Sequence, residues 1–144
     1  MNIHTRICAM AVILLMATPF LAQASSLAET EDLSNSLLVL WTSGDKEVAQ
    51  NMVFMYVYNA KKNKWWGRVR MLIWGPSAKL LSEDKDLQAG LTQMKEIGVE
   101  LYACKACADR YGVGEKLIEL GVTVKYTGTD LTDWLKAGWI NLTI

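Results

Sequence analysis

Two cysteines three positions apart, Cys104 and Cys107, are the residues of this sequence best suited to covalent chemistry. A thiolate is a strong nucleophile, and the Cys-x-x-Cys spacing lets the two sulfurs close into a small disulfide ring. Such a pair can exchange disulfides, carry a sulfur atom as a persulfide, or form a plain structural disulfide. A loop this short constrains the unfolded chain little, so a disulfide here would add little stability. We therefore favour a reactive pair and keep an inert disulfide as the alternative.

The residues around the pair favour its ionisation. An apolar strand pattern runs directly into Cys104, and the next helix is expected to begin at or just after Cys107. Backbone N–H groups at a helix N-terminus stabilise negative charge, and Lys105 and Arg110 add positive charge nearby. Both effects lower the pKa of a thiol, whereas Asp109 acts in the opposite direction.

The first residues have the pattern of a cleavable secretory signal, which we assign to residues 1–24. Arg6 supplies positive charge, residues 9–22 are mainly apolar, and Ala-Gln-Ala at 22–24 has the small residues that a signal peptidase accepts. The alternative is an uncleaved anchor, but the run is short of the roughly 20 apolar residues that a membrane span needs. The sequence therefore predicts cleavage after Ala24, no membrane span after cleavage, and a periplasmic or secreted protein.

Cleavage removes His4, the only histidine, and one of the three cysteines, Cys8. Without histidine, a Ser-His-Asp or Cys-His catalytic arrangement is excluded in the mature chain. Two cysteines supply half of a tetrahedral zinc site, so a zinc site would need two chains. The mature chain carries 14 basic and 15 acidic side chains, since Arg6 is lost, and has no broad positive field for nucleic acid. We predict no cofactor, no metal and no nucleic-acid partner.

The mature chain alternates short apolar runs with longer amphipathic segments. Residues 25–35 are predicted to be a flexible lead-in, and residues 36–144 one domain. Strands are expected at residues 37–41, 69–74, 99–103, 122–126 and 139–143; helices are expected at 48–59, at 78–97 with a break near Asp84, after Cys107 up to Gly121, and at 131–137. This alternation predicts an α/β fold with a mostly parallel five-stranded sheet and helices on both faces, with the strand order left open.

In open parallel sheets, ligands gather beyond the carboxyl ends of the strands. Cys104 stands at such an end, directly after the third predicted strand. Thr127 and Gly128 follow the fourth predicted strand in the same way. These two residues are therefore candidates for the rim of a pocket around the thiol.

Three motifs carry a resemblance to a known family. They are Trp-Gly-Pro-Ser at 74–77, a Gly-Val strand ending in Ala-Cys-Lys-Ala-Cys at 98–107, and Leu-Gly-Val-x-Val-x-Tyr-x-Gly at 120–128. Over residues 37–144 the chain resembles the DsrE/DsrF-like family, in its exported branch. The resemblance implies a three-layer α/β/α sandwich, assembly into trimers or hexamers, and a cysteine after the third strand that carries sulfur as a persulfide. Cys104 matches that position, whereas the signal segment and Cys107 depart from the cytoplasmic sulfur-relay subunits.

The sequence hypothesis is thus an exported DsrE-like protein that handles sulfane sulfur or thiol redox state. Cys104 would attack a sulfane-sulfur donor and hold the persulfide, Cys107 would resolve it, and Lys105 would stabilise the thiolate. The expected partners are sulfur donor and acceptor proteins or small sulfur species, and any enzymatic activity would be sulfurtransferase-like or thiol–disulfide chemistry. The alternative is a non-enzymatic binding or oligomerisation module with a structural disulfide.

Overall fold

The computed structural model describes residues 33–144, so the predicted signal segment, its cleavage point and residues 25–32 of the lead-in lie outside the described residues. The last three residues of the lead-in form a short 3-10 helix, η1 (Leu33–Asn35). The strands are β1 (Ser36–Trp41), β2 (Arg68–Ile73), β3 (Glu100–Cys104), β4 (Thr123–Lys125) and β5 (Ile140–Thr143). They form one sheet in the order β4-β3-β2-β1-β5, in which the described pairings are parallel.

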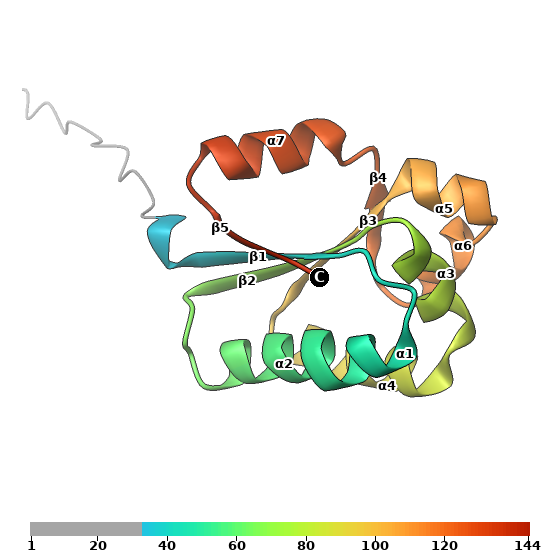
Figure 1. Cartoon of the computed structure of the whole chain (residues 1–144), viewed down its shortest axis with the longest axis horizontal. Coiled ribbons are helices and arrows are strands. Elements are labelled where there is room, and N and C mark those ends of the chain that lie inside the picture. The colour runs from blue at the N-terminus through green and yellow to red at the C-terminus, as the bar shows by residue number, and fades with distance from the viewer. Residues whose placement is uncertain (1–32) are drawn as a thin grey trace, which may run out of the picture. The chain divides into compact units, whose positions relative to one another are not determined.

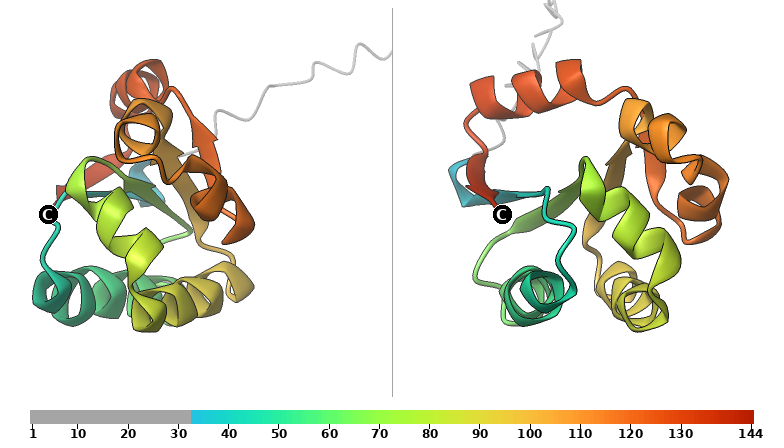
Figure 2. Two further views of the ribbon diagram at one scale, coloured as in Figure 1. Left: turned by 90° about the vertical axis from the view of Figure 1, so that its right-hand side faces the viewer. Right: turned by 45° about the vertical axis from the view of Figure 1, so that its right-hand side comes forward.

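Helices cover both faces of this sheet, which confirms the predicted three-layer α/β/α fold (Figure 1). They are α1 (Lys46–Val48), a π-helical segment η2 (Ala49–Phe54), α2 (Met55–Lys62), α3 (Pro76–Glu83), α4 (Lys85–Glu96), α5 (Lys105–Tyr111), α6 (Gly114–Glu119) and α7 (Gly128–Lys136). Figure 2 shows α2 and α4 below the sheet and α7 above it.

The strands are apolar on both sides because each side of the sheet is covered. Successive side chains of a strand point to opposite faces. Leu37, Val39 and Trp41 of β1 belong to the larger core, between the sheet and the face covered by α2, α3 and α4. Leu38 belongs to a smaller core on the other face. This two-sided burial is why the central strands read as continuous apolar runs.

Helix α7 crosses the sheet because the strands it connects, β4 and β5, lie at opposite edges. It packs on the smaller core, where Leu131 and Trp134 meet Leu38, Leu72 and Trp139. Leu33 of η1 packs against the same core. Its crossing puts the N-terminus of α7 at the carboxyl end of β4, close to the end of β3.

The predicted break near Asp84 is confirmed. Asp84 has an extended backbone, and its carboxylate accepts hydrogen bonds from the backbone N–H groups of Asp86 and Leu87, both at 3.0 Å. A side chain that satisfies the free N–H groups of a first turn starts a new helix there. The predicted 78–97 segment is accordingly two helices, α3 and α4.

The predicted start of the helix after the cysteines is wrong. Cys104 has extended backbone angles (φ −69°, ψ 114°) and occupies the N-cap position, so α5 begins at Lys105, between the two cysteines. The single helix expected up to Gly121 is also two helices, because Gly112 adopts a left-handed conformation (φ 67°) that ends α5.

The last helix begins earlier than predicted. The Thr127 carbonyl already accepts a hydrogen bond from the Leu131 N–H at 2.8 Å, so the helical turn starts at Gly128 rather than at Leu131.

Candidate functional site

Cys104 lies at the carboxyl edge of the sheet and lines a cavity. Cys104 is the last residue of β3, is 4% exposed, and pairs in register with Lys125 of β4. Beyond these ends the chain leaves β2 through Trp74 and β4 through Tyr126, and both residues lie beside Cys104 in the lining of one cavity. The resulting cavity of about 310 Å³ is lined by Trp74, Cys104, Ala106, Tyr126, Thr127, Gly128 and Thr129.

The structure therefore brings three of the five sequence-predicted site residues, Cys104, Thr127 and Gly128, into one cavity wall. Cys107 lies close to Cys104 and to Gly75 in the turn after β2, and it is not among the residues that line the cavity. Both cysteines are free thiols. Sequence reasoning missed Trp74 and Tyr126 as lining residues. Both directly follow a strand, which is the same signal that pointed to Thr127.

Burial and three neighbouring groups, Gly75, Cys104 and Arg110, set the ionisation of Cys107, and the positive charge of Arg110 lowers its pKa. The thiol is half-buried, which raises its pKa; a hydrogen bond from the Gly75 backbone N–H lowers it, and the hydrogen bond with Cys104 raises it again. The net effect is a raised pKa for Cys107, opposite to the lowering that sequence reasoning expected for a thiol of this motif. Burial is the largest of these causes, since it penalises the charged form.

Gly75 can reach the Cys107 sulfur because of an unusual turn. Its backbone angles (φ 72°, ψ −137°) belong to a region that only glycine adopts without strain. The turn is anchored by Ser77, whose hydroxyl donates to the Trp41 carbonyl at 2.7 Å and accepts from the Trp74 N–H at 3.1 Å. The Trp-Gly-Pro-Ser motif thus joins the ends of β1 and β2 and positions one hydrogen-bond donor at the thiol pair.

Lys105, which was predicted to stabilise the Cys104 thiolate, directs its charge elsewhere. Its ammonium nitrogen lies 2.7 Å from both carboxylate oxygens of Asp109 and 5.6 Å from the centroid of the Tyr126 ring. The hydrogen bond with Asp109 raises the pKa of Lys105. A role for Lys105 at the thiolate stays a prediction and has no support from these contacts. A larger hollow of about 500 Å³ on this side of α5 is lined by Lys105 and Asp109, and its lining includes neither thiol.

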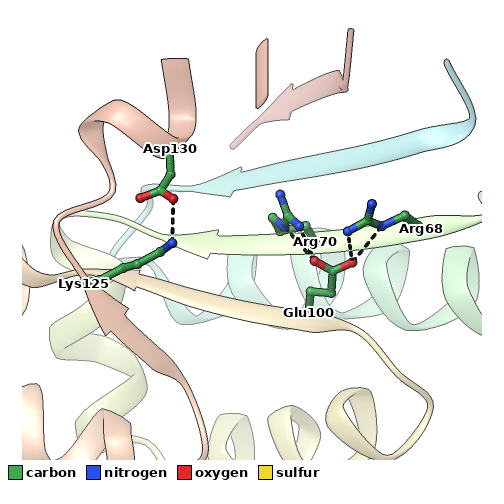
Figure 3. Close-up of polar contacts among 5 residues, drawn as sticks. All are labelled: Arg68, Arg70, Glu100, Lys125 and Asp130. Atoms are coloured by element: carbon green, nitrogen blue, oxygen red, sulfur yellow. Dashed lines mark hydrogen bonds and ion pairs between the residues drawn. The ribbon is translucent and has the colours of Figure 1, made fainter. Parts of the chain in front are cut away.

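The N-terminus of α7 forms the wall opposite Cys104. Thr127 occupies its N-cap position, yet its side chain makes no capping hydrogen bond. The residue is fully buried, and its Oγ1 has no partner within the part of the chain that the structure describes. In the first turn, Asp130 is paired with Lys125 at 2.5 Å (Figure 3).

A second charged cluster lies further along β2 and β3, away from the thiols. The Glu100 carboxylate accepts from Arg68 Nε at 3.0 Å and from Arg70 Nε at 2.9 Å (Figure 3). Arg70 is 5% exposed, and its guanidinium lies 4.2 Å from the ring centroid of Trp134 and 4.1 Å from that of Trp139. Sequence reasoning did not single out this cluster, since the arginines alternate with apolar residues as solvent-facing residues of a strand do.

Among residues 33–144, no three His, Cys, Asp or Glu side chains are grouped closely enough to hold a metal ion. The described helices include none with the length and apolar content needed to cross a membrane.

Comparisons with known proteins fit this geometry. The model of the DsrE/DsrF-like family matches residues 36–144. A solved structure of a conserved protein of unknown function from Bacteroides thetaiotaomicron is similar to this chain, with a TM-score of 0.74 and 36% sequence identity over 76% of this chain and 95% of that one. No curated protein matches the chain.

Proposed function

The chain belongs to the DsrE/DsrF-like family, and from this premise we propose that it carries sulfane sulfur on Cys104 and resolves the persulfide with Cys107. Membership of the family supports a sulfur-relay-like role in general. The observation that carries the finer proposal is a buried strand-end cysteine that lines a cavity, with a second free cysteine close to it.

The first step is attack by the Cys104 thiolate on the sulfane sulfur of a donor. A bond forms between Cys104 Sγ and that sulfur, and the donor's leaving group departs with the electron pair of the broken bond. The product is a persulfide whose outer sulfur lies in the cavity. A thiolate of an acceptor can then take the outer sulfur and regenerate Cys104.

The second step in the absence of an acceptor is resolution by Cys107. Its sulfur gives up its proton and attacks Cys104 Sγ, and the outer sulfur leaves as hydrogen sulfide with that proton. The two cysteines are oxidised to a disulfide by two electrons, and the sulfane sulfur is reduced to sulfide. Cys107 suits this role because its raised pKa keeps it protonated while the first step takes place.

Mass spectrometry after incubation with polysulfide tests the proposal. We expect a 32 Da adduct on Cys104, its loss in Cys104→Ser, and its accumulation in Cys107→Ser, which cannot resolve it. Asp109→Asn serves as a control on the same helix. The persulfide role is excluded when neither wild type nor Cys107→Ser forms an adduct, or when Cys104→Ser forms as much as wild type.

The rival function, a binding or oligomerisation module with an inert disulfide, predicts a different redox behaviour. A structural disulfide has a reduction potential below about −300 mV, whereas a working pair has a higher one. Equilibration of the purified protein against glutathione and dithiothreitol buffers distinguishes the two.

Export and assembly are also part of the proposal. The intact mass of protein recovered from its own compartment should correspond to a chain beginning at Ser25, and a chain that still begins at Met1 would exclude cleavage. Light scattering on the same material should give the mass of a trimer or hexamer, as the family resemblance implies.

A further inference from the structure

Thr127 is a buried hydroxyl without a partner in the wall of the cavity that Cys104 faces. The residue is fully buried, its Oγ1 lacks a hydrogen-bond partner among the described residues, and it lines the cavity. Leaving a buried hydroxyl unpaired costs about 1–3 kcal/mol, and native proteins rarely leave such groups without a role. A ligand oxygen that reached this hydroxyl from the cavity would remove this cost.

The end of α7 supplies further donors at the same place. The first backbone N–H groups of a helix have no partner inside the helix, and they favour a negative group. A threonine at the N-cap normally accepts a hydrogen bond from one of them, but Thr127 does not. Because α7 has nine residues, its first turn is backed by a full helix. Gly128 and Thr129 of this first turn line the cavity together with Thr127.

The charges around the cavity are paired with each other. Lys105 is bound to Asp109, and Lys125 is bound to Asp130. The donors left for a ligand are therefore the neutral Thr127 hydroxyl and the backbone N–H groups of α7. Neutral donors of this kind suit the oxygens of an oxyanion, as in other helix N-terminal anion sites.

We propose that the cavity binds a small sulfur oxyanion of the thiosulfate type, with its oxygens on Thr127 and the N-terminus of α7 and its sulfane sulfur toward Cys104. This inference rests on the proposed function and names its donor class. The cavity of about 310 Å³ has room for such a molecule, since one water takes about 30 Å³.

The transfer that follows is balanced without any other reactant. The Cys104 thiolate attacks the outer sulfur of thiosulfate, the new S–S bond forms, and the old S–S bond breaks. Sulfite leaves with the electron pair. The charge of the thiolate is kept on the persulfide, and the two negative charges of thiosulfate leave on sulfite. The α7 N-terminus would hold the oxygens of the leaving group throughout.

Binding is tested first in Cys104→Ser, where transfer is blocked. Titration of the purified protein with thiosulfate, followed by NMR of the backbone amides, should shift the resonances of residues 128–130. Thr127→Val in this background should weaken binding at least about tenfold, because a hydrogen bond to a charged group is lost. Thr127→Ser should keep most of the affinity, and the exposed Thr123→Val is the matched control. Equal affinity in Thr127→Val, or shifts confined to other residues, would overturn the inference.

Transfer is tested in the protein with both cysteines. The amount of 32 Da adduct formed from thiosulfate, divided by the amount formed from polysulfide, should fall at least tenfold in Thr127→Val. An unchanged ratio counts against the site. The absence of an adduct from both donors contradicts the persulfide function, and an adduct from polysulfide but none from thiosulfate counts against thiosulfate as the donor. Anion binding in Cys104→Ser is measured independently of both. If Thr127→Val does not fold, the amide shifts in the protein that retains Thr127 still decide the location of the anion.

Discussion

The Cys107 thiol is acted on by groups whose effects on its pKa differ in sign. Burial and Cys104 raise the pKa, and the Gly75 N–H lowers it. Two of these effects, burial and the neighbouring Cys104, keep the proton on Cys107. Cys107 therefore keeps its proton to higher pH than an ordinary cysteine does. The reactivity of the Cys107 thiol depends in part on Cys104.

Removal of Cys104 should lower the pKa of Cys107. Cys104→Ala removes a contribution that raises this pKa and leaves the Gly75 N–H, which lowers it. The pH dependence of iodoacetamide alkylation at Cys107, read by peptide mass spectrometry, should move to lower pH than in wild type. The exposed Glu119→Gln is a control that should leave the profile in place. A profile that stays in place or moves to higher pH in Cys104→Ala would contradict the coupling.

Among the elements, the turn between β2 and α3 contributes most directly to the thiol pair. Gly75 has a positive φ of 72°, while a Cβ built on it would meet no other atom within 4 Å. Glycine is therefore required here by the backbone conformation and not by a lack of space for a side chain.

Gly75→Ala should cost about 1–3 kcal/mol of stability, the usual strain of a non-glycine residue in such a conformation. Relaxation of this strain moves the N–H away from Cys107, so the pKa of Cys107 should rise further. Urea unfolding measures the first effect, and the alkylation profile measures the second. Gly128→Ala is a matched control for stability, since Gly128 also has nothing within 4 Å of a built Cβ but has no positive φ. Equal stability losses in the two variants would show that the turn is not strained.

Most elements were predictable because their signals are local. The apolar runs of β1 and β2 and the capping role of Asp84 depend on residues next to one another in the chain. The strand order was not predictable, since it depends on where α7 carries the chain across the sheet. The start of α5 was missed because cysteine gives no capping signal, although Cys104 is the N-cap residue.

The candidate site was predictable only in part. The position of Cys104 and of Thr127 after strands implied that both lie at one edge of a parallel sheet. The contact between Gly75 and Cys107 joins segments that are far apart in the sequence, and no local pattern encodes it. The absence of a partner for the Thr127 hydroxyl could not be predicted either, because a threonine directly before a helix ordinarily caps that helix.

For the domain as a whole, the cluster around Arg70 holds the α7 layer to the sheet. None of the α7 residues is itself fully enclosed, so its attachment depends on contacts such as Trp134 on the Arg70 guanidinium. Arg70 in turn is bound to Glu100 of the neighbouring strand. The Glu100 carboxylate of β3 thus holds Arg70 of β2, and Arg70 in turn contacts Trp134 of α7.

Glu100 should therefore make the stability of the domain sensitive to acid. Burial raises the pKa of Glu100, but the hydrogen bonds from Arg68 and Arg70 outweigh it, so the pKa lies below the ordinary value of 4.5. A carboxylate with a lowered folded pKa contributes stability that is complete above its unfolded pKa. This contribution is lost as the pH falls from about 4.5 through the lowered folded pKa.

Glu100→Gln should remove this pH dependence and destabilise the domain at neutral pH. The loss at pH 7 should be about 2 kcal/mol, less than the roughly 3–5 kcal/mol for breaking a fully buried ion pair, because the Glu100 side chain is 30% exposed. Urea unfolding at pH 7 and pH 3, with far-UV circular dichroism as the probe, should give a smaller difference between the two pH values for Glu100→Gln than for wild type. The exposed Glu119→Gln should behave as wild type. An equal loss of stability on acidification in Glu100→Gln and wild type would contradict this prediction. The acid sensitivity would then come from other carboxylates, and the Arg70 cluster would not make the attachment of α7 depend on pH.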